Sequence, residues 1–493
     1  MAMPLNILFV LTDDQGPWAL NCAGTPELDT PNLNRLANQG LRLTNFFCAS
    51  PVCSPARASI LTGTIPSAHG VHDWIRSGNL DKAEMDRLGI VNPYGGYADE
   101  DKPIQYLSGR RTFTDALAEQ GYRCALSGKW HLGDSMTPQH GFCDWYTLGK
   151  GGACYYHPDM IEHGRIQVEN RYITDLVTDK AVGWLEDMAD GDSPFYLGVH
   201  YTAPHSPWEP EHHPADDIRR YADCTFASIP DLPDHPGLTT GPVFGTQRRR
   251  TNLVGYFAAV TAMDRAVGRL LDVLDRRSLW ESTIVVFLSD NGMCMGHHGV
   301  WGKGNGTFPQ NMYEESVKVP FLIACPQAAA RAGQQVEDLA SALDIYPTLL
   351  DLVGIADPQV RVLPGRSLQP LLSGQTDSHL NERPVVICEE YGPVRMLRTK
   401  RFKYVHRYPY GPHELYDLAE DPGETRNLID EPGLQQTAAA MKRDLELWYR
   451  RYVDPDVDGS KEGVTGLGQL CRAGLFANRA KVYHADRYKE KQP

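Results

Sequence analysis

The alternation of short apolar runs with segments of helical periodicity is the feature that most constrains the fold of this chain. Apolar runs of strand length occur at residues 6–12, 122–127, 195–201 and 283–289. Apolar side chains at helical spacing occur between them, at residues 32–39, 112–120 and 253–274. Strands that alternate with helices along a chain form a parallel sheet covered by helices. We therefore predict an α/β fold with a large, mostly parallel sheet sandwiched by helices.

A small and polar stretch at residues 372–376 indicates a domain boundary. We predict a large domain over residues 1–375 and a smaller α+β domain over residues 376–493. The predicted elements of the smaller domain are antiparallel strands at 394–399 and 402–406, a helix at 434–452, and a terminal extension from residue 453. Residues 77–109 and 209–247 are rich in Pro, Gly and polar side chains, which predicts long surface loops or lids.

Charge and cysteine content exclude several classes of protein. The formal net charge is -14, with 48 Lys and Arg against 62 Asp and Glu. A general nucleic-acid binder needs an excess of cations to displace phosphate counterions, so we expect no nucleic-acid partner. No apolar run approaches the roughly 20 residues that cross a bilayer, so we expect no membrane partner. The 11 cysteines are odd in number and lack C-x-x-C pairs, which predicts neither a disulfide framework nor a zinc module.

The start of the chain bears on its location. The first apolar run begins within a few residues of Met1, with no basic region before it and no small-residue cleavage site after it. We expect a cytoplasmic, reducing location, or a periplasmic or secreted one if a signal peptide was removed.

Polar residues follow two of the predicted strands directly. Asp13 and Asp14 come after the first strand, and Asp290 and Asn291 follow residues 283–289. Ligand sites in open α/β sheets lie beyond the carboxyl ends of the strands. An all-oxygen ligand set suits a hard divalent cation such as Ca²⁺ or Mg²⁺ rather than zinc. For each pair taken alone, an Asx turn or a helix cap is the competing interpretation.

Cys53 lies in a polar turn before a predicted helix, and Arg57 follows one helical turn later. A lone cysteine is usually a small buried hydrophobe. Here, however, the arrangement places a cation and a helix start beside the thiol, which also predicts a reactive group. The residue pattern leaves both interpretations open.

The string Cys53-Ser54-Pro55-Ala56-Arg57, continued by Leu61-Thr62-Gly63, resembles the signature of the type I sulfatases, which depend on formylglycine and belong to the alkaline phosphatase superfamily. Further matching segments follow in the family's order at 13–15, 128–133, 203–205, 289–292 and 344–348, and then at 414–418, 421–422 and 427–428. A match to any one of these motifs can occur by chance, but a match to the whole set in this order is specific to the family. The resemblance implies an alkaline phosphatase-like fold.

The activity that the resemblance implies is hydrolysis of a sulfate ester of a carbohydrate, or of an aryl or alkyl sulfate. A maturation enzyme would convert Cys53 to formylglycine. One hydroxyl of the hydrated aldehyde would attack sulfur, and the second would later expel sulfate. The family also implies one divalent metal, usually Ca²⁺, with Mg²⁺ or Mn²⁺ as alternatives. The implied metal ligands are Asp13, Asp14, Cys53, Asp290 and Asn291.

The same resemblance implies roles for five further side chains. Arg57 resembles the residue that stabilises the nucleophile, and His131 resembles the base of the expulsion step. Lys129, His205 and Lys303 resemble ligands of the sulfate oxygens, with His205 also the proton donor to the leaving alcohol.

Lys303 is our choice over Lys318, although an inserted loop separates it from the Tyr-Glu segment that usually follows closely. Its glycine-rich flanks let the backbone approach an anion. We expect the charge of Lys318 to be solvated on a strand.

Two other functions stay open at this stage. Relatives in the same superfamily hydrolyse phosphonate monoesters or phosphodiesters with an equivalent nucleophile and metal. A catalytically silent sulfoglycan-binding protein is the other alternative, but the complete set of site residues argues against it. The residues of these motifs act on the sulfate group alone, so the motifs predict neither the leaving alcohol nor the oligomeric state.

Overall fold

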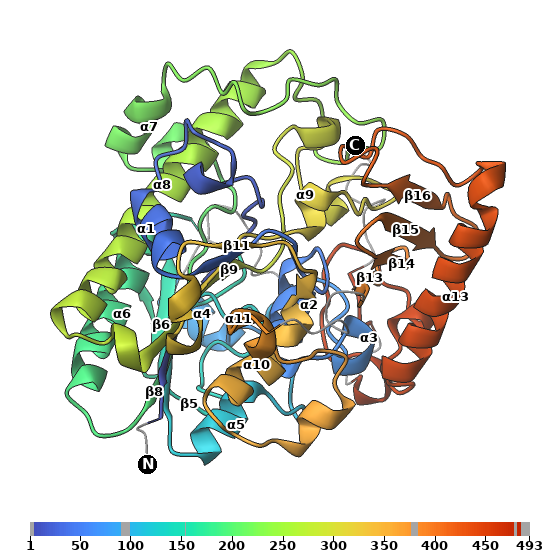
Figure 1. Ribbon diagram of the computed structural model, residues 1–493. Helices are drawn as coiled ribbons and strands as arrows, with labels where there is room; N and C mark the ends of the chain where they lie inside the picture. Colours follow the sequence, from blue (N-terminus) through green and yellow to red (C-terminus); the bar gives the residue numbers. More distant parts are fainter. Residues whose placement is uncertain (1–3, 90–98, 153, 376–382, 478–480, 485–493) are drawn as a thin grey trace.

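Residues 4–89, 99–152, 154–375, 383–477 and 481–484 are described by the computed structural model drawn in Figure 1. Its largest sheet has the strand order β11-β2-β10-β9-β1-β8-β4-β5-β6-β7. The central strands are β9 (Thr283–Ser289), β1 (Asn6–Thr12), β8 (Phe195–His200), β4 (Arg123–Gly128) and β5 (Phe142–Leu148). These strands are parallel to one another, which confirms the predicted mostly parallel sheet.

Antiparallel pairing begins toward the edges of this sheet. β10 (Phe321–Ala324) runs antiparallel to β9 on one side, and β6 (Asp159–Glu162) runs antiparallel to β5 on the other. The outer strands are β2 (Leu41–Leu43), β11 (Gln335–Val336) and β7 (Arg165–Val168). The carboxyl ends of the five parallel strands therefore lie next to one another, in the central part of the strand order.

Helices cover both faces of the sheet, which explains why its strands are continuously apolar. In β1, alternate side chains pack into two different hydrophobic clusters, one on each face. One face is covered by α2 (Cys53–Thr62), α5 (Phe113–Glu119) and α10 (Ile345–Leu352), and the other by α1 (Pro31–Gln39), α6 (Ile173–Ala189) and α8 (Gln247–Arg276). Figure 1 shows α6 and α8 on one side of the sheet and α2 and α10 on the other.

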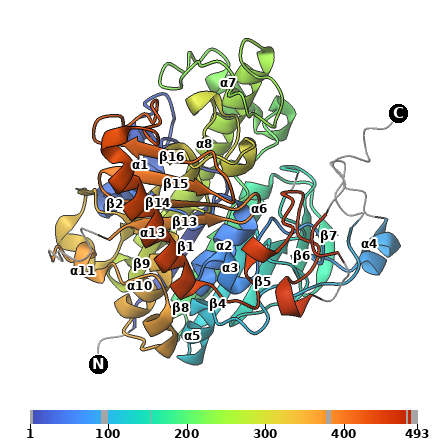
Figure 2. The same cartoon turned by 90° about the vertical axis from the view of Figure 1, so that its right-hand side faces the viewer.

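A smaller antiparallel sheet follows in the last third of the chain. It consists of β13 (Val385–Glu389), β14 (Val394–Arg398), β15 (Phe402–Arg407) and β16 (Glu414–Asp417). Helix α13 (Gln435–Tyr452) packs against β14 and β15 (Figure 2). The apolar side chains of this sheet belong to the same cluster as α2 and α10, so the two sheets share a core. Residues 376–382, where the predicted domain boundary falls, lie outside the described residues.

Two stretches predicted as loops each contain a short helix, α4 (Lys82–Leu88) and α7 (Ala215–Tyr221). Residues 90–98 of the first stretch lie outside the described residues. Asp81 caps α4 by accepting from the backbone N–H groups of Ala83 and Glu84, a local signal that a composition argument overlooks. None of the helices in the described ranges is long and apolar enough to span a membrane.

The chain after α13 returns to the loop that follows α2. Asp454 N–H donates to the Ser67 carbonyl at 2.9 Å, and Gln469 N–H donates to the Trp74 carbonyl at 2.8 Å. Arg76 N–H donates in turn to the Gln469 carbonyl at 2.9 Å. The terminal extension, whose role the sequence did not predict, is therefore hydrogen-bonded to residues just downstream of Cys53.

Candidate active site

Three buried carboxylates meet where β1 and β9 end. The two strands are parallel neighbours with Thr12 opposite Ser289, so the residues that follow them emerge at the same place. Asp13, Asp14 and Asp290 are buried, and their carboxylate oxygens lie within 4.8 Å of one another. The Asn291 side-chain amide donates to Asp14 Oδ1 at 2.8 Å. The structure thus brings together the four residues that the sequence placed at these strand ends.

Cys53 is the first residue of α2 and faces these carboxylates. Its Sγ lies 3.2 Å from Asp13 Oδ1, and the residue is 4% exposed. Burial, and then the Asp13 carboxylate, raise the pKa of the Cys53 thiol well above its usual range. These surroundings favour the protonated thiol, which is a poor nucleophile in its encoded form.

Each carboxylate has one cationic partner. Arg57 Nε lies 2.9 Å from Asp290 Oδ2, and Lys303 Nζ lies 2.5 Å from Asp14 Oδ1. Lys129 Nζ forms an ion pair with Asp13 Oδ2. Lys303 Nζ also lies 2.7 Å from Cys53 Sγ, so it reaches the position of the proposed nucleophile. The site combines three acids with three fixed cations around one cysteine.

His131 is buried beside this cluster and has a left-handed backbone conformation (φ 56°). Its Nε2 lies 3.1 Å from the Ile75 carbonyl oxygen. Because a carbonyl only accepts, Nε2 donates and Nδ1 is left as the acceptor of a neutral ring. Nδ1 is buried and has no hydrogen-bond partner among the described residues. Burial, and then the Lys129 charge, lower the pKa of His131 well below its usual range, so the ring is neutral and Nδ1 carries a lone pair.

His205 approaches the cluster from its more open side. Its side chain is 25% exposed, and its Nε2 lies 3.7 Å from Asp14 Oδ2. Its Nδ1 donates to the Ser206 carbonyl at 2.7 Å, which directs Nε2 toward the acids. His205 is thus placed to meet the part of a ligand that extends outward.

Family models match nearly the whole chain. A model described as Sulfatase covers residues 5–355, and a model described as N-sulphoglucosamine sulphohydrolase, C-terminal, covers residues 296–450. The chain belongs to the sulfatase family. Its members are sulfuric ester hydrolases, so this sulfatase is an enzyme of that class.

Named relatives cover most of this sulfatase. The N-acetylglucosamine-6-O-sulfatase of Bacteroides thetaiotaomicron is 27% identical over 94% of this chain and 89% of its own. The ulvan-active sulfatase of Formosa agariphila is 31% identical over 87% of this chain and 77% of its own.

Solved structures share the fold. One is of a protein in complex with its substrate D-glucosamine-2-N,6-O-disulfate, with a TM-score of 0.71, 24% identity, and coverage of 93% of this chain and 100% of that chain. A phosphonate monoester hydrolase of Agrobacterium radiobacter has a TM-score of 0.65, 20% identity, and coverage of 91% of this chain and 96% of its own. The expected alkaline phosphatase-like fold is thereby confirmed, while the fold alone does not separate the two chemistries.

Lys303, and not Lys318, lies beside Cys53. Lys318 Nζ is 3.5 Å from Glu314 Oε2, and its side chain is 20% exposed. The expectation that the charge of Lys318 is solvated is wrong, because Lys318 pairs with Glu314, the first residue of the short helix α9 (Glu314–Val317). Its backbone does form an antiparallel β-bridge with Phe47.

Two pairs of histidines elsewhere have separate structural partners. His297 Nδ1 contacts the Cys294 carbonyl and His298 Nε2 contacts Glu315, so the two do not form a joint site with each other. His69 contacts Ser59, and His72 contacts the Val457 carbonyl and the Tyr483 hydroxyl.

Two contributors to the site were not identified from the sequence. The Ile75 carbonyl fixes the tautomer of His131, but a backbone acceptor has no sequence signal. A Cβ atom at Gly151 would lie 2.0 Å from His131 Nε2, so only glycine leaves room for the imidazole. The glycine-rich segment Gly149-Lys150-Gly151-Gly152 was the available clue.

Proposed function

We propose that this sulfatase hydrolyses a sulfate ester of a carbohydrate, with one divalent metal and a formylglycine made from Cys53 by a maturation enzyme. The convergence of three buried carboxylates, Asn291 and Lys303 on residue 53 is the observation that carries the proposal. Carbohydrate is the proposed substrate class because the relatives include an N-acetylglucosamine-6-O-sulfatase and an ulvan-active sulfatase.

The donor set fits a hard divalent cation. Burial, and then repulsion by Asp13, raise the pKa of Asp290 to about 7, so the fixed cations do not fully offset the acids. The proposed ligands are Asp13, Asp14, Asp290, Asn291 and residue 53, and their oxygens favour Ca²⁺, with Mg²⁺ or Mn²⁺ as alternatives. When bound, the ion supplies positive charge that polarises the sulfate.

Residue 53 supplies the nucleophile in this proposal. The cysteine sulfur marks the position that an oxygen of hydrated formylglycine would take. Attack of that oxygen on sulfur forms one S–O bond as the S–O bond to the sugar breaks. Arg57, held by Asp290 at 2.9 Å and by the Lys129 carbonyl at 3.0 Å, orients its charge toward this region.

Protons move through the two histidines. His205 Nε2 lies toward the open side and donates a proton to the departing sugar oxygen. His131 Nδ1 then takes the proton of the second hydroxyl of residue 53, and the carbonyl re-forms as sulfate leaves. Lys129 and Lys303 bind the sulfate oxygens. Their ammonium groups lie beside Asp13 and Asp14, at the site where the sulfate would react.

Turnover of matched esters tests the proposed function. A panel of sulfated monosaccharides, an aryl sulfate and an aryl phosphodiester separates the alternatives. We expect the highest kcat/KM on a sulfated sugar. A clear preference for the phosphodiester would assign the chain to the phosphoryl alternative, and binding of sulfated sugars without turnover by fully modified protein would assign it to a silent binding protein.

Metal content gives an independent test of the acidic cluster. Asp290→Asn removes one anionic ligand, so we expect loss of stoichiometric metal and of turnover together. Mass-spectrometric metal analysis, followed by chelation and addition of Ca²⁺, Mg²⁺ or Mn²⁺, measures both. Asp272→Asn is the matched control, since Asp272 is 56% exposed and pairs with Arg35 on the surface. Full metal occupancy in Asp290→Asn would remove Asp290 from the ligand set.

A further inference from the structure

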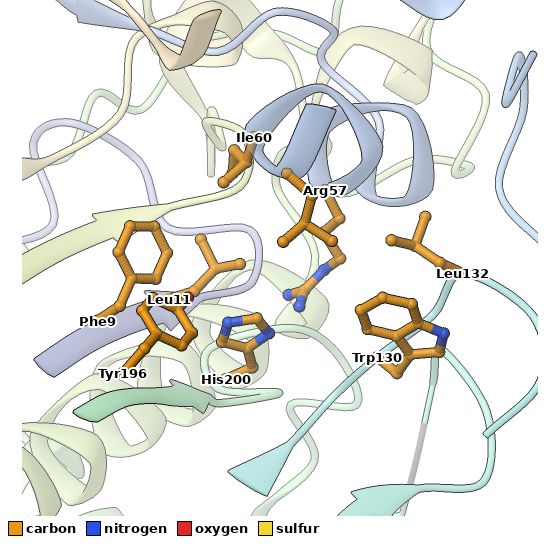
Figure 3. Close-up of a pocket in the computed structure, with 9 residues that line it drawn as sticks. Phe9, Leu11, Arg57, Ile60, Trp130, Leu132, Tyr196 and His200 are labelled. Atoms are coloured by element: carbon orange, nitrogen blue, oxygen red, sulfur yellow. The ribbon is translucent and has the colours of Figure 1, made fainter. Parts of the chain in front are cut away.

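A small cavity lies beside Arg57 and His200 (Figure 3). It offers about 10 Å³ to the centre of a water-sized sphere, which is the space of one water molecule. Arg57 and His200 line it together with apolar and aromatic side chains such as Phe9 and Leu11. Every lining residue is buried.

Two polar atoms of the residues that line this cavity have no hydrogen-bond partner in the part of the chain that the structure describes. Arg57 uses Nε for Asp290 and Nη1 for the Lys129 carbonyl, but its Nη2 is buried and unpartnered. His200 Nε2 is also buried and unpartnered. In Figure 3 the Arg57 guanidinium and the His200 imidazole lie close to each other among the lining side chains. A buried donor without a partner is unfavourable, and more so when it is charged.

The two unpartnered atoms are chemically complementary. His200 Nδ1 lies 3.2 Å from the Lys129 carbonyl oxygen, which only accepts, so Nδ1 carries the proton. Burial, and then the Arg57 charge, lower the pKa of His200 to about 3, so the ring is neutral and Nε2 is an acceptor. Arg57 Nη2 only donates. A water molecule accepts from one atom and donates to the other.

We propose that this cavity binds one ordered water that bridges Arg57 Nη2 and His200 Nε2, which makes His200 a positioning residue for Arg57. The Lys129 carbonyl already ties Arg57 Nη1 and His200 Nδ1 together, and the water closes a ring of hydrogen bonds behind the guanidinium. The bridge holds the third guanidinium nitrogen, so the charge of Arg57 keeps one orientation toward Asp290 and residue 53. The catalytic consequence rests on the proposed function, whereas the water site does not.

A high-resolution crystal structure of the metal-loaded protein tests the water site directly. We expect one ordered water within hydrogen-bonding distance of both Arg57 Nη2 and His200 Nε2. A dry cavity, or a water that contacts only one of the two atoms, would overturn the proposal. This result does not depend on whether the protein turns over a sulfate ester.

Two substitutions at His200 test its positioning role in formylglycine-containing enzyme. His200→Leu removes the acceptor, and we expect kcat to fall about tenfold while KM changes less than twofold. His200→Gln keeps an acceptor at a similar distance from the backbone and is expected to retain at least half of kcat. Unchanged kcat in His200→Leu, or equal losses in the two variants, would refute the positioning role.

His406→Leu is the matched control for the loss of a buried imidazole. His406 is 3% exposed, lies in β15, and contacts the Tyr404 hydroxyl at 2.8 Å, away from the site. We expect it to lower the melting temperature as His200→Leu does but to leave kcat unchanged. A fall in kcat that only follows the fall in stability across all three variants would mean that His200 has a structural role alone.

Discussion

Cys53 shows how burial limits the chemistry of a side chain at the scale of one residue. Its thiol is held protonated by burial and by Asp13, and a thiol has no second hydroxyl with which to expel sulfate. The same position occupied by hydrated formylglycine has both the attacking and the expelling oxygen. The surroundings of Cys53 therefore favour a modified residue over the encoded one.

Conversion of Cys53 is measurable by mass. The peptide that carries residue 53 should be about 18 Da lighter than encoded, because oxygen replaces sulfur and two hydrogens are lost. Activity should rise with the modified fraction when a maturation enzyme is co-expressed, and Cys53→Ala should be inactive. Cys143→Ala is the control, since Cys143 is exposed and outside the site. Full turnover by protein with only the encoded mass would refute this mechanism.

His205 should matter most when the leaving alcohol is a poor one. Without the donor, His205→Ala is expected to lower kcat/KM by about 100-fold for sugar sulfates, and far less for aryl sulfates with acidic phenols. A series of aryl sulfates with graded phenol pKa values, measured beside a sugar sulfate, gives the slope. If the dependence of kcat/KM on phenol pKa were the same in His205→Ala as in the enzyme that retains His205, His205 would be excluded as the acid.

Single residues were predictable where a motif or a strand end marked them. Asp13, Asp14, Asp290 and Asn291 follow strands whose parallel pairing brings them together, and the Cys53 and Arg57 string is distinctive. The roles of these residues remain predictions. His200 and the Ile75 carbonyl had no such mark, because their contribution depends on which atoms face Arg57 and His131 in the folded chain.

At the scale of elements, the glycine-rich segment at residues 149–152, which follows β5, leaves the space that the His131 imidazole occupies. We expect Gly151→Ala to lower kcat by at least about tenfold, because its Cβ would meet the imidazole and displace Nδ1 from the site. Gly152→Ala is a control in the same segment, since a Cβ there meets no described residue within 4 Å. Steady-state kinetics of both variants, with melting temperatures, measure the effect. Equal activity in the two variants would mean that His131 does not need this exact placement.

Strands with strong apolar patterns were predicted within a residue or two. Helix α8 begins six residues before its predicted range of 253–274, because residues 247–252 are polar, and the short polar helices were not predicted. Residues 6–12 and 283–289 coincide with β1 and β9, because a strand buried on both faces is continuously apolar. Helices α4 and α7 lie within stretches predicted as loops. Most of their residues are at least partly exposed, so they have no apolar periodicity that a sequence pattern would detect.

At the scale of the whole molecule, the terminal extension from residue 453 is joined to residues 67–76, which follow α2. Gln469 is fully buried, and its side chain accepts from His72 N–H at 2.9 Å and donates to the Gly70 carbonyl at 3.0 Å. Its backbone pairs with Trp74 and Arg76 on either side of Ile75. The extension thus positions the carbonyl that orients His131. No sequence pattern predicted this, because the contacts join segments far apart in the chain.

Gln469→Ala should therefore affect both stability and catalysis. It removes the side-chain partner of three backbone groups, His72 N–H and the Gly70 and Cys471 carbonyls, so we expect the free energy of unfolding to fall by about 2 kcal/mol and kcat to fall more than KM rises. Denaturant unfolding and kinetics measure the two effects. Leu475→Ala is the control in the same extension, as Leu475 is 78% exposed. A loss of stability without a change in kcat would separate the extension from His131.

The distance in sequence between the two partners also sets an order of events during synthesis. His72 and Gln469 are 397 residues apart, so at ~5–20 residues per second the ribosome needs roughly 20–80 s to reach the second after making the first. During that interval the loop beside Cys53 lacks the segment that fastens it. A maturation enzyme that must reach a side chain buried in the finished protein has this time window in which to act.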